Sequence, residues 1–259
     1  IPILPLVVRP LSDFPAGKGY DVMDLMKPVL GFAKPAWKFF LPLVAVTVIL
    51  AVIGWHIPAA VVGVLALYVM YFFRDPKRKT PSIPNSICCP ADGKVVSVVE
   101  VPCEHMQGGR ALRVAIFLNI FNVHVQRAPI SGEVIGVDSK PGKFGNAMNE
   151  KCSEENESTT VWIDSDFGVV GVRQIAGAIA RRIVCKAKVG DVLERGARYG
   201  LIQFGSRVEL FLPLSATVKV QPGQKVVGGL TCLAVLYEDE VRKGLSQERV
   251  AKIQMALAS

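Results

Sequence analysis

Residues 201–213 read LIQFGSRVELFLP, an apolar segment typical of a β-strand that is interrupted by the pair Gly205-Ser206. Glycine weakens a strand and often marks a bulge or a close approach of backbone, and it allows backbone angles that other residues resist. A serine directly after such a glycine can turn its hydroxyl onto the preceding carbonyl. Ser206 is therefore a candidate nucleophile, although an isolated Gly-Ser pair is a weak signal because short motifs often arise by chance.

Similar short segments, rich in Val and Ile and separated by Gly and Pro, fill the chain after Pro81. They predict strands at 94–101, 111–117, 124–128, 132–137, 159–164, 169–175, 182–185, 200–204, 208–212, 216–220 and 230–237. This spacing is typical of an all-β sandwich or barrel. The turns at 91–95, 188–196 and 220–226 resemble those of biotinyl/lipoyl-type proteins. We therefore expect a mainly β, barrel-sandwich-hybrid-like domain over residues 81–259, with a short helix at 246–257.

An apolar stretch at residues 39–73 precedes this domain and contains one ionisable side chain, His56. As a single helix it would be about 50 Å long, whereas the hydrocarbon core of a bilayer is about 30 Å thick. The sequence GWHIP at 54–58 provides a break, so we predict a membrane helical hairpin, 39–54 and 58–73, in a segment 39–80 that ends in a basic linker. Each helix is short for a membrane span, so a spanning hairpin and a shallow re-entrant hairpin both fit.

Basic residues are concentrated around this hairpin. The formal net charge is +8, yet residues 1–80 hold nine Lys and Arg against four acids, and residues 81–259 hold 21 against 18. This pattern fits an anionic membrane surface and lacks the basic face with interleaved aromatics that nucleic-acid binding needs. Lys34, Lys38 and the basic residues in 74–79 flank the hairpin. By the positive-inside rule they place the main domain on the cytoplasmic side of the cell (inner) membrane.

The remaining composition gives weaker indications. Four prolines within the first 15 residues exclude a regular helix there. A membrane-surface segment over 1–38, with an amphipathic helix at 20–34, an ordinary surface helix and a disordered tail all fit this region. The six cysteines show no Cys-x-x-Cys spacing, so we expect reduced thiols and no metal site.

Two further segments give the Gly-Ser pair its meaning. Residues 117–134 read FLNIFNVHVQRAPISGEV, and residues 89–95 read CPADGKV. Together with the FGSR run they resemble, in the same order, the motifs of the phosphatidylserine decarboxylases, in particular the short prokaryotic form, over about residues 65 to 237. The resemblance implies a self-processing, pyruvoyl-dependent enzyme. Such an enzyme converts phosphatidylserine to phosphatidylethanolamine and carbon dioxide in phospholipid biosynthesis.

The resemblance also implies roles for individual residues. Ser206 would attack the carbonyl of Gly205, and β-elimination of the resulting ester would cut the chain and leave a covalent pyruvoyl group as the cofactor, without a metal. His124 would be the base, and Asp92 would hold it in the base-competent tautomer, as in a Ser-His-Asp triad. Longer members of the family have a second histidine three residues earlier. Phe121 stands there in this chain, so the proton donor for decarboxylation is not assigned.

The phosphodiester of such a substrate needs an anion-binding group. Arg127 and the loop 142–146, with Lys143 and Asn146, are the candidates, because the loop glycines can present backbone N–H groups. Lys151 and Arg207 are weaker candidates.

Other interpretations are compatible with the sequence. An archaetidylserine-type ether lipid with a serine headgroup would use the same site. A non-catalytic, membrane-tethered barrel-sandwich carrier module would instead need a modifiable lysine in a Met-Lys-Met or Asp-Lys-Ala setting, and neither tripeptide occurs. The expected partners are the phospholipid substrate and the membrane, and a homodimer is compatible with the sequence.

Overall fold

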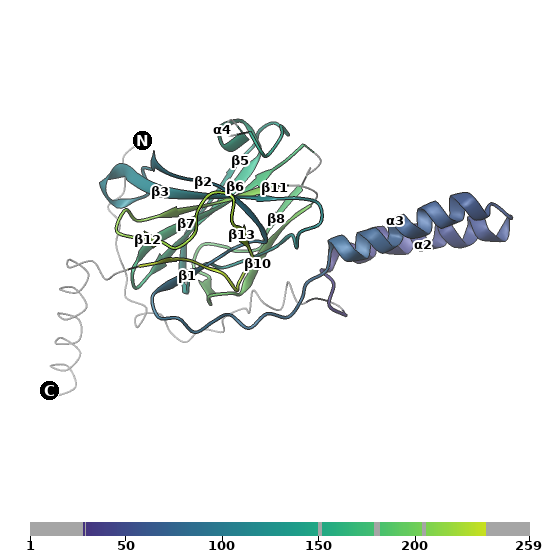
Figure 1. Cartoon of the computed structure of the whole chain (residues 1–259), viewed down its shortest axis with the longest axis horizontal. Coiled ribbons are helices and arrows are strands. Elements are labelled where there is room, and N and C mark those ends of the chain that lie inside the picture. Colours follow the sequence, from purple (N-terminus) through teal and green to yellow (C-terminus); the bar gives the residue numbers. More distant parts are fainter. Residues whose placement is uncertain (1–27, 29, 150–151, 179–181, 204–205, 237–259) are drawn as a thin grey trace.

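The computed structural model describes residue 28 and residues 30–149, 152–178, 182–203 and 206–236. Figure 1 shows a β-rich body with a helical hairpin that projects from one end. Several predictions concern residues that the structure does not describe. These are the helix at 246–257, Lys151 and Gly205, together with most of the segment 1–38 and most of the helix at 20–34.

The hairpin consists of α2 (Pro35–Val52) and α3 (His56–Phe72), joined by a turn in which Gly54 has a φ of 85°. Two helices with a break between them are what the sequence predicts. Each helix begins a few residues earlier than expected, because proline is tolerated in the first turn of a helix. Pro35 is the first residue of α2 and Pro58 is the third residue of α3.

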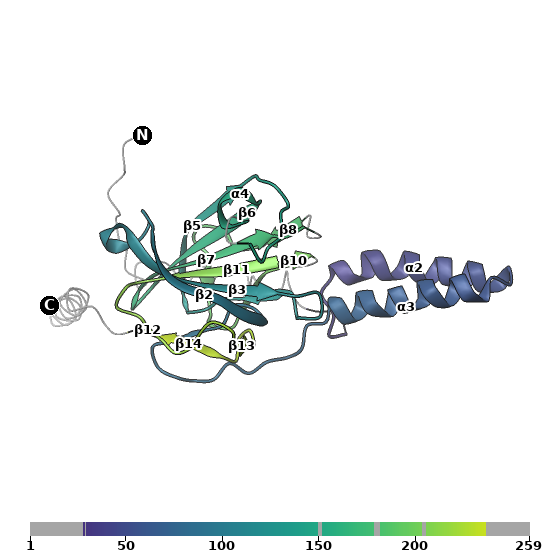
Figure 2. The ribbon, with the colours of Figure 1, turned by 45° about the horizontal axis from the view of Figure 1, so that its top comes forward.

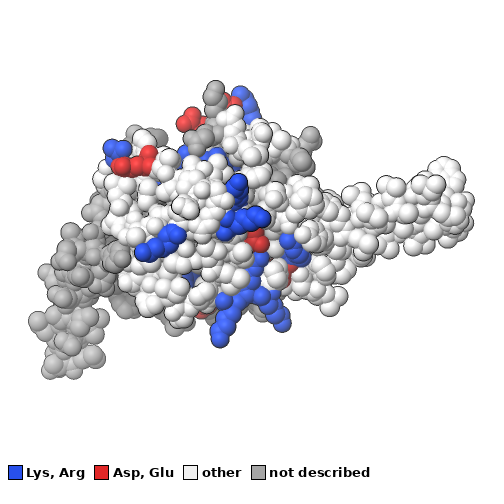
Figure 3. All heavy atoms as spheres, viewed as in Figure 1, with Lys and Arg blue, Asp and Glu red and all other residues white. Residues whose placement is uncertain are grey.

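The surface of the hairpin is apolar. α2 is long and apolar enough to cross a membrane, and α3 is a shorter apolar helix. Val52 and Ile57, next to the turn, are each 81% exposed. In the view of Figure 3 the projecting arm shows no charged side chain, whereas lysines and arginines gather on the visible face of the body. Exposed apolar area of this extent marks a surface that contacts membrane or protein.

The body is built from three antiparallel sheets. The largest has the strand order β13-β2-β3-β11-β7-β6-β5-β9 and curls into a half-barrel. Two small sheets, β1-β14-β12 and β4-β10-β8, accompany it. The strands are β1 (Ser86–Cys88), β2 (Gly93–Pro102), β3 (Arg110–Leu118), β4 (Val125–Arg127), β5 (Gly132–Lys140), β6 (Ser158–Ser165), β7 (Gly168–Ala176), β8 (Arg182–Cys185), β9 (Val192–Leu193), β10 (Arg198–Gln203), β11 (Ser206–Leu212), β12 (Thr217–Val218), β13 (Lys225–Val226) and β14 (Cys232–Val235).

The mainly β prediction is confirmed, and each predicted strand segment contains a strand. Short helical pieces, η2 (Gln107–Gly109) and α4 (Cys152–Glu155), lie between strands. The sequence did not predict the strands β1, β9 and β13. Each is only two or three residues long, which is too short to show a recognisable alternation of apolar and polar residues.

Strand β11 lies in the middle of the large sheet between β3 and β7, and all of its residues are buried. Side chains alternate between the two faces of a strand. Val208, Leu210 and Leu212 belong to the main hydrophobic core, so Ser206 shares this inner face. Arg207 and Glu209 therefore occupy the opposite face, where the Nε of Arg207 donates to Oε1 of Glu209 at 2.9 Å.

The hairpin and its linker are anchored to the body. A second cluster of buried residues joins Phe72 and Phe73, at the end of α3, to Val123, Val125 and Leu201 of the body. Figure 2 shows the base of the hairpin beside the strands of the body rather than at the end of a free tether.

Buried ion pairs hold the linker that follows. The carboxylate of Asp75 accepts from Arg127 at 3.1 Å and from Arg198 at 2.5 Å. Arg78 pairs with Asp92 further along. These contacts pack the linker residues 74–80 against the β-rich body.

Candidate active site

Ser206 is the first residue of β11 and is completely buried. Its backbone lies opposite Leu118 of β3 and Ala176 of β7. Among the described residues its Oγ has no hydrogen-bond partner. A buried hydroxyl without a partner costs about 1–3 kcal/mol, and such groups in native structures often mark functional sites. The hydroxyl is therefore available for chemistry at the position that the sequence predicts.

His124 lies between β3 and β4 and is also completely buried. Its Nδ1 is 2.9 Å from the carbonyl oxygen of Asn122. A carbonyl can only accept, so Nδ1 carries the proton and Nε2 carries the lone pair. Nε2 has no partner within the described part of the chain. Burial lowers the pKa of His124 to about 4, so the imidazole is neutral at pH 7 and Nε2 can accept a proton.

Residues that sequence reasoning missed hold His124 in place. The ring of Phe72, the last residue of α3, stacks on the imidazole. The Nε2 of Gln126 donates to the carbonyl oxygen of His124 at 2.7 Å, and Gln174 donates to Oε1 of Gln126 at 2.9 Å. Gln126 and Gln174 are both fully buried. Buried amides in a strand are the one sequence signal that could have drawn attention to them, because they require buried partners.

The chain segments that carry His124 and Ser206 meet at one end of the large sheet. β3 ends at Leu118, opposite Ser206, and the chain then reaches His124 within six residues. The backbone N–H of Ile202, which precedes Ser206 by four residues, points at the carbonyl oxygen of His124 at 3.3 Å. The topology thus brings together two segments that are about 80 residues apart in sequence.

The predicted contact between Asp92 and His124 is not present. The carboxylate of Asp92 accepts from Nη1 and Nη2 of Arg78 at 2.5 and 2.8 Å and from the backbone N–H of Gly228 at 2.8 Å. The carbonyl of Asn122, rather than Asp92, sets the tautomer of His124. The Asp92 charge still raises the pKa of His124, against the larger lowering by burial.

The structure places Arg127 against the linker that follows the hairpin, where most of its donors are already bound. Its guanidinium is buried and donates to Asp75, to the carbonyl oxygen of Pro76 and to that of Gly196, each at 3.1 Å. Its Nε has no hydrogen-bond partner among the described residues, and Arg127 also lines a pocket of about 580 Å³ together with Arg78 and Arg198. Arg207 is unsuited to bind an anion, because it is fully buried against Glu209.

The loop 142–146 is fixed to the Ser206 strand pair through Asn156. The Oδ1 of Asn156 accepts from the N–H of Gly145 at 3.0 Å, and its Nδ2 donates to the carbonyl oxygen of Ala176 at 2.7 Å. Ala176 is the cross-strand partner of Ser206. The N–H of Gly145 is thus not available to an anion, and Asn156 is a site residue that the sequence pattern did not indicate.

Lys143 and Asn146, the two side chains of the loop 142–146 that the sequence suggested for phosphate binding, both have polar groups that can still donate hydrogen bonds. The Nζ of Lys143 is exposed and lies 3.3 Å from Oε2 of Glu155. The Oδ1 of Asn146 accepts from the N–H of Met148 at 3.0 Å, which leaves its side-chain NH₂ as a donor.

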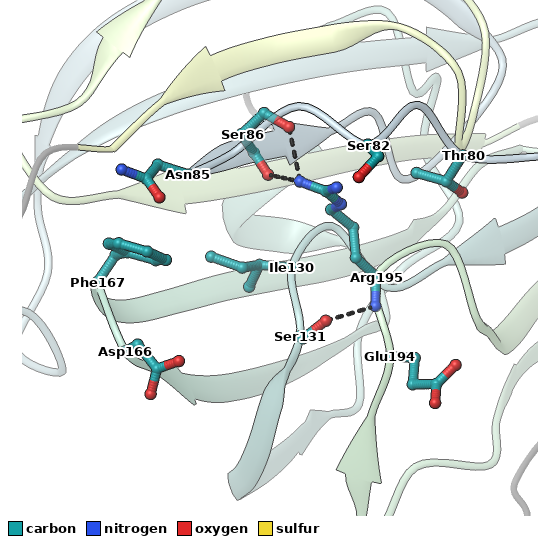
Figure 4. A pocket seen from close by; sticks show the side chains of 10 residues that line it. All are labelled: Thr80, Ser82, Asn85, Ser86, Ile130, Ser131, Asp166, Phe167, Glu194 and Arg195. Atoms are coloured by element: carbon teal, nitrogen blue, oxygen red, sulfur yellow. Dashed lines mark hydrogen bonds between the residues drawn. The ribbon is translucent and has the colours of Figure 1, made fainter.

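The pocket drawn in Figure 4 is separate from these residues. It measures about 460 Å³ and is lined mostly by polar side chains, together with Ile130 and Phe167. In this pocket the guanidinium of Arg195 donates to the carbonyl oxygen and to Oγ of Ser86, and the backbone N–H of Arg195 donates to Oγ of Ser131. Arg195 therefore holds the chain that enters β1. Within the described residues, no three His, Cys, Asp or Glu side chains are grouped as metal ligands.

The fold and the site together define a mainly β protein that has an apolar helix long enough to cross a membrane and a buried serine whose hydroxyl has no partner among the described residues. The family model for phosphatidylserine decarboxylase matches residues 65–234. The chain is 44% identical over 214 residues to the phosphatidylserine decarboxylase proenzyme of Symbiobacterium thermophilum, covering 82% of this chain and 98% of that protein. The proenzymes of Burkholderia vietnamiensis and Geotalea uraniireducens are 41% identical over 217 residues and 42% identical over 192 residues. These matches cover 83% and 74% of this chain, and 100% and 90% of those proteins. The chain belongs to the phosphatidylserine decarboxylase family.

Proposed function

We propose that this chain is a self-processing phosphatidylserine decarboxylase that uses a pyruvoyl group derived from Ser206. The observation that carries the proposal is the buried Ser206 hydroxyl without a partner, in a chain whose relatives over nearly their whole length are named as proenzymes of that activity. No observation favours the ether-lipid substrate or the carrier module.

Processing begins when His124 Nε2 removes the proton of the Ser206 hydroxyl. The Oγ forms a bond to the carbonyl carbon of Gly205, and the peptide C–N bond breaks, which gives an ester and a free amine. Loss of the α-proton of residue 206 then expels the Gly205 carboxylate and cuts the chain. Addition of water and release of ammonia convert residue 206 into the pyruvoyl group at the start of β11.

When formed, the pyruvoyl group supplies an electron sink for loss of carbon dioxide from an amine substrate. The residues around it exclude water, since Leu118 and Ala176 on either side of Ser206 are fully buried. The Phe121 side chain, which stands where longer relatives have a histidine, is 58% exposed and cannot donate a proton. In this proposal His124, rather than a water or a backbone group, also holds the proton that replaces the lost carboxylate.

Lys143 and Asn146 bind the phosphate of the substrate. Their loop is hydrogen-bonded through Asn156 to the strand beside Ser206, and their side chains offer an ammonium group and an amide donor. The contacts of Arg127 with Asp75 make it the weaker of the three sequence candidates. Asp92 supports His124 through its charge and through the Arg78 pair rather than by direct contact.

The hairpin lies in the cell (inner) membrane with the body on the cytoplasmic side. The exposed apolar surface of α2 and α3 supports insertion. The positive charges that flank the hairpin, and their absence from its turn, support this orientation. Both ends of the hairpin are attached to the body at its base, so the site lies near the membrane surface.

Intact-mass measurement of the purified full chain tests the proposal. We expect two fragments, 1–205 and 206–259, the second with a pyruvoyl group at its N-terminus. The Ser206→Ala variant lacks the nucleophile and should remain one chain without decarboxylase activity. The exposed Ser215 offers a matched control, because Ser215→Ala should process normally. A cut Ser206→Ala chain, or an intact active wild type, would reject the proposal.

A further inference from the structure

A cavity of about 270 Å³ lies at the base of the hairpin, where the start of α2 faces the strands β8 and β10. Figures 1 and 2 both place the ends of these strands beside the hairpin base. The cavity contains neither His124 nor the loop 142–146, so the proposed catalytic and phosphate-binding residues do not account for it.

Four basic side chains line this cavity, and they come from two elements. Lys34 and Lys38 are one helical turn apart at the start of α2, and Arg182 and Lys186 are four residues apart in and after β8. Lys38, Arg182 and Lys186 are exposed, so these three charged ends can approach a ligand from solvent or from the headgroup region of a bilayer.

The negative charge of Asp75 does not neutralise the basic side chains that line the cavity. Asp75 is the one acidic residue among the described lining residues. Its two carboxylate oxygens are already bound by Arg127 and Arg198 at 3.1 and 2.5 Å. The cavity therefore presents an excess of positive charge that suits an anion.

Apolar side chains line the cavity beside these basic residues and lead toward the hairpin. Phe39 of α2 and Val184 and Leu201 of the body are among them. Phe39 is 40% exposed, and the apolar residues that follow it along α2 are exposed as well. A cavity with a basic rim and an apolar wall that leads into a membrane helix matches an amphiphile, whose phosphate and acyl chains need both surfaces.

We propose that this cavity binds the phosphate headgroup of an anionic glycerophospholipid from the leaflet around the hairpin. The acyl chains then lie along the apolar face of α2. The inference rests on membrane insertion of the hairpin, not on decarboxylation, and phosphatidylserine is one member of this ligand class. Gln203 also lines the cavity and pairs with Arg182 across the β8–β10 ladder. A bound lipid would thus lie three residues from Ser206 in sequence and would hold the processing strand at the membrane surface.

Lipid retention by the full-length Ser206→Ala chain tests this site, because that variant forms no pyruvoyl group and binding is measured apart from activity. The protein is purified in detergent micelles that contain equal amounts of phosphatidylglycerol and phosphatidylcholine, and retained lipids are counted by native mass spectrometry. We expect one phosphatidylglycerol per chain in preference to phosphatidylcholine. Adding Lys38→Ala and Lys186→Ala should lower its occupancy about tenfold or more, since each basic residue contributes to binding of anionic lipid.

The matched control removes the same charge elsewhere. Lys188 and Lys219 are exposed and do not line the cavity, so Lys188→Ala with Lys219→Ala should leave the occupancy unchanged. Equal retention of the two lipids, or an equal loss in both double variants, would overturn the proposal. Displacement of the lipid by 10 mM inorganic phosphate would overturn it as well, because a soluble anion would then be the ligand.

Discussion

The ring of Phe72 lies against the imidazole of His124, with the ring centroids 4.2 Å apart and the ring planes inclined by 29°. Phe72 is the last residue of the apolar hairpin and is fully buried. The membrane-facing part of the chain therefore covers the proposed catalytic base. This contact helps to bury His124, and burial is the main reason for the low pKa of its side chain.

Replacement of Phe72 should expose His124 and raise its pKa toward the ordinary value. Phe72→Ala is expected to raise the pKa of His124 from about 4 toward 6.5 and to destabilise the fold by about 3–5 kcal/mol. Titration by NMR measures the pKa, and with three histidines in the chain a His124→Gln spectrum assigns the signal. Phe73→Ala is the matched control, because Phe73 is fully buried in the same cluster. If both variants raise the pKa of His124 equally, a general loss of packing in the cluster explains the shift, and the ring contact between Phe72 and His124 does not.

The low pKa of His124 also predicts how stability depends on pH. The folded state disfavours the protonated imidazole, so the stabilisation is complete above about pH 6.5 and is lost as the pH falls toward about 4. Between pH 7 and pH 5 the wild type should lose about 2 kcal/mol more than His124→Gln. Thermal unfolding of both proteins in detergent at pH 7 and pH 5 measures the difference. Parallel losses in the two proteins would contradict burial of a neutral histidine.

The Arg78–Asp92 pair should act as a unit. Each side chain is largely buried, and breaking such a pair leaves an uncompensated charge at a cost of about 3–5 kcal/mol. Asp92→Asn and Arg78→Ala are therefore both expected to lower the melting temperature and to slow cleavage after Gly205 to a similar degree. A gel time course measures the cleavage rate. Slow cleavage in Asp92→Asn together with normal cleavage in Arg78→Ala would instead indicate direct action of Asp92 on His124.

Lys143 and Arg127 should differ in what their loss affects. Lys143→Ala is expected to raise KM for the phospholipid about tenfold and to leave self-processing unchanged, because processing involves no phosphate. Arg127→Ala should chiefly lower stability, since it leaves the buried Asp75 with Arg198 as its remaining cation. Kinetics in mixed micelles and melting temperatures separate the two effects. An unchanged KM in Lys143→Ala would remove the loop as the phosphate site.

Two truncations should locate the start of the catalytic unit. Removal of residues 1–73 keeps Asp75 and Arg78 and should leave a folded protein with lowered stability, because Phe72 and Phe73 no longer cover the body. Removal of residues 1–80 also deletes both buried ion-pair partners and should abolish folding. Circular dichroism and melting curves compare them. Equal stability of the two proteins would show that the linker contacts contribute nothing.

The sequence alone determined the elements of this protein and its candidate nucleophile. Short segments rich in Val and Ile, separated by Gly and Pro, are local signals, so most of the strands and the break at Gly54 could be predicted. The motifs around Ser206 and His124 likewise lie within short stretches, and their order along the chain indicates the family.

Tertiary structure decided the partners of each side chain. Asn122, rather than Asp92, sets the tautomer of His124, and Asp75 pairs with Arg127. Phe72 reaches His124 across 52 positions of sequence, and Asn156 reaches Ala176 across 20. The types and the spacing of residues in the sequence do not indicate such long-range contacts. A buried charge or amide binds whichever complementary group the packed sheets and the hairpin place beside it, because leaving it unpaired costs more free energy than any local preference supplies.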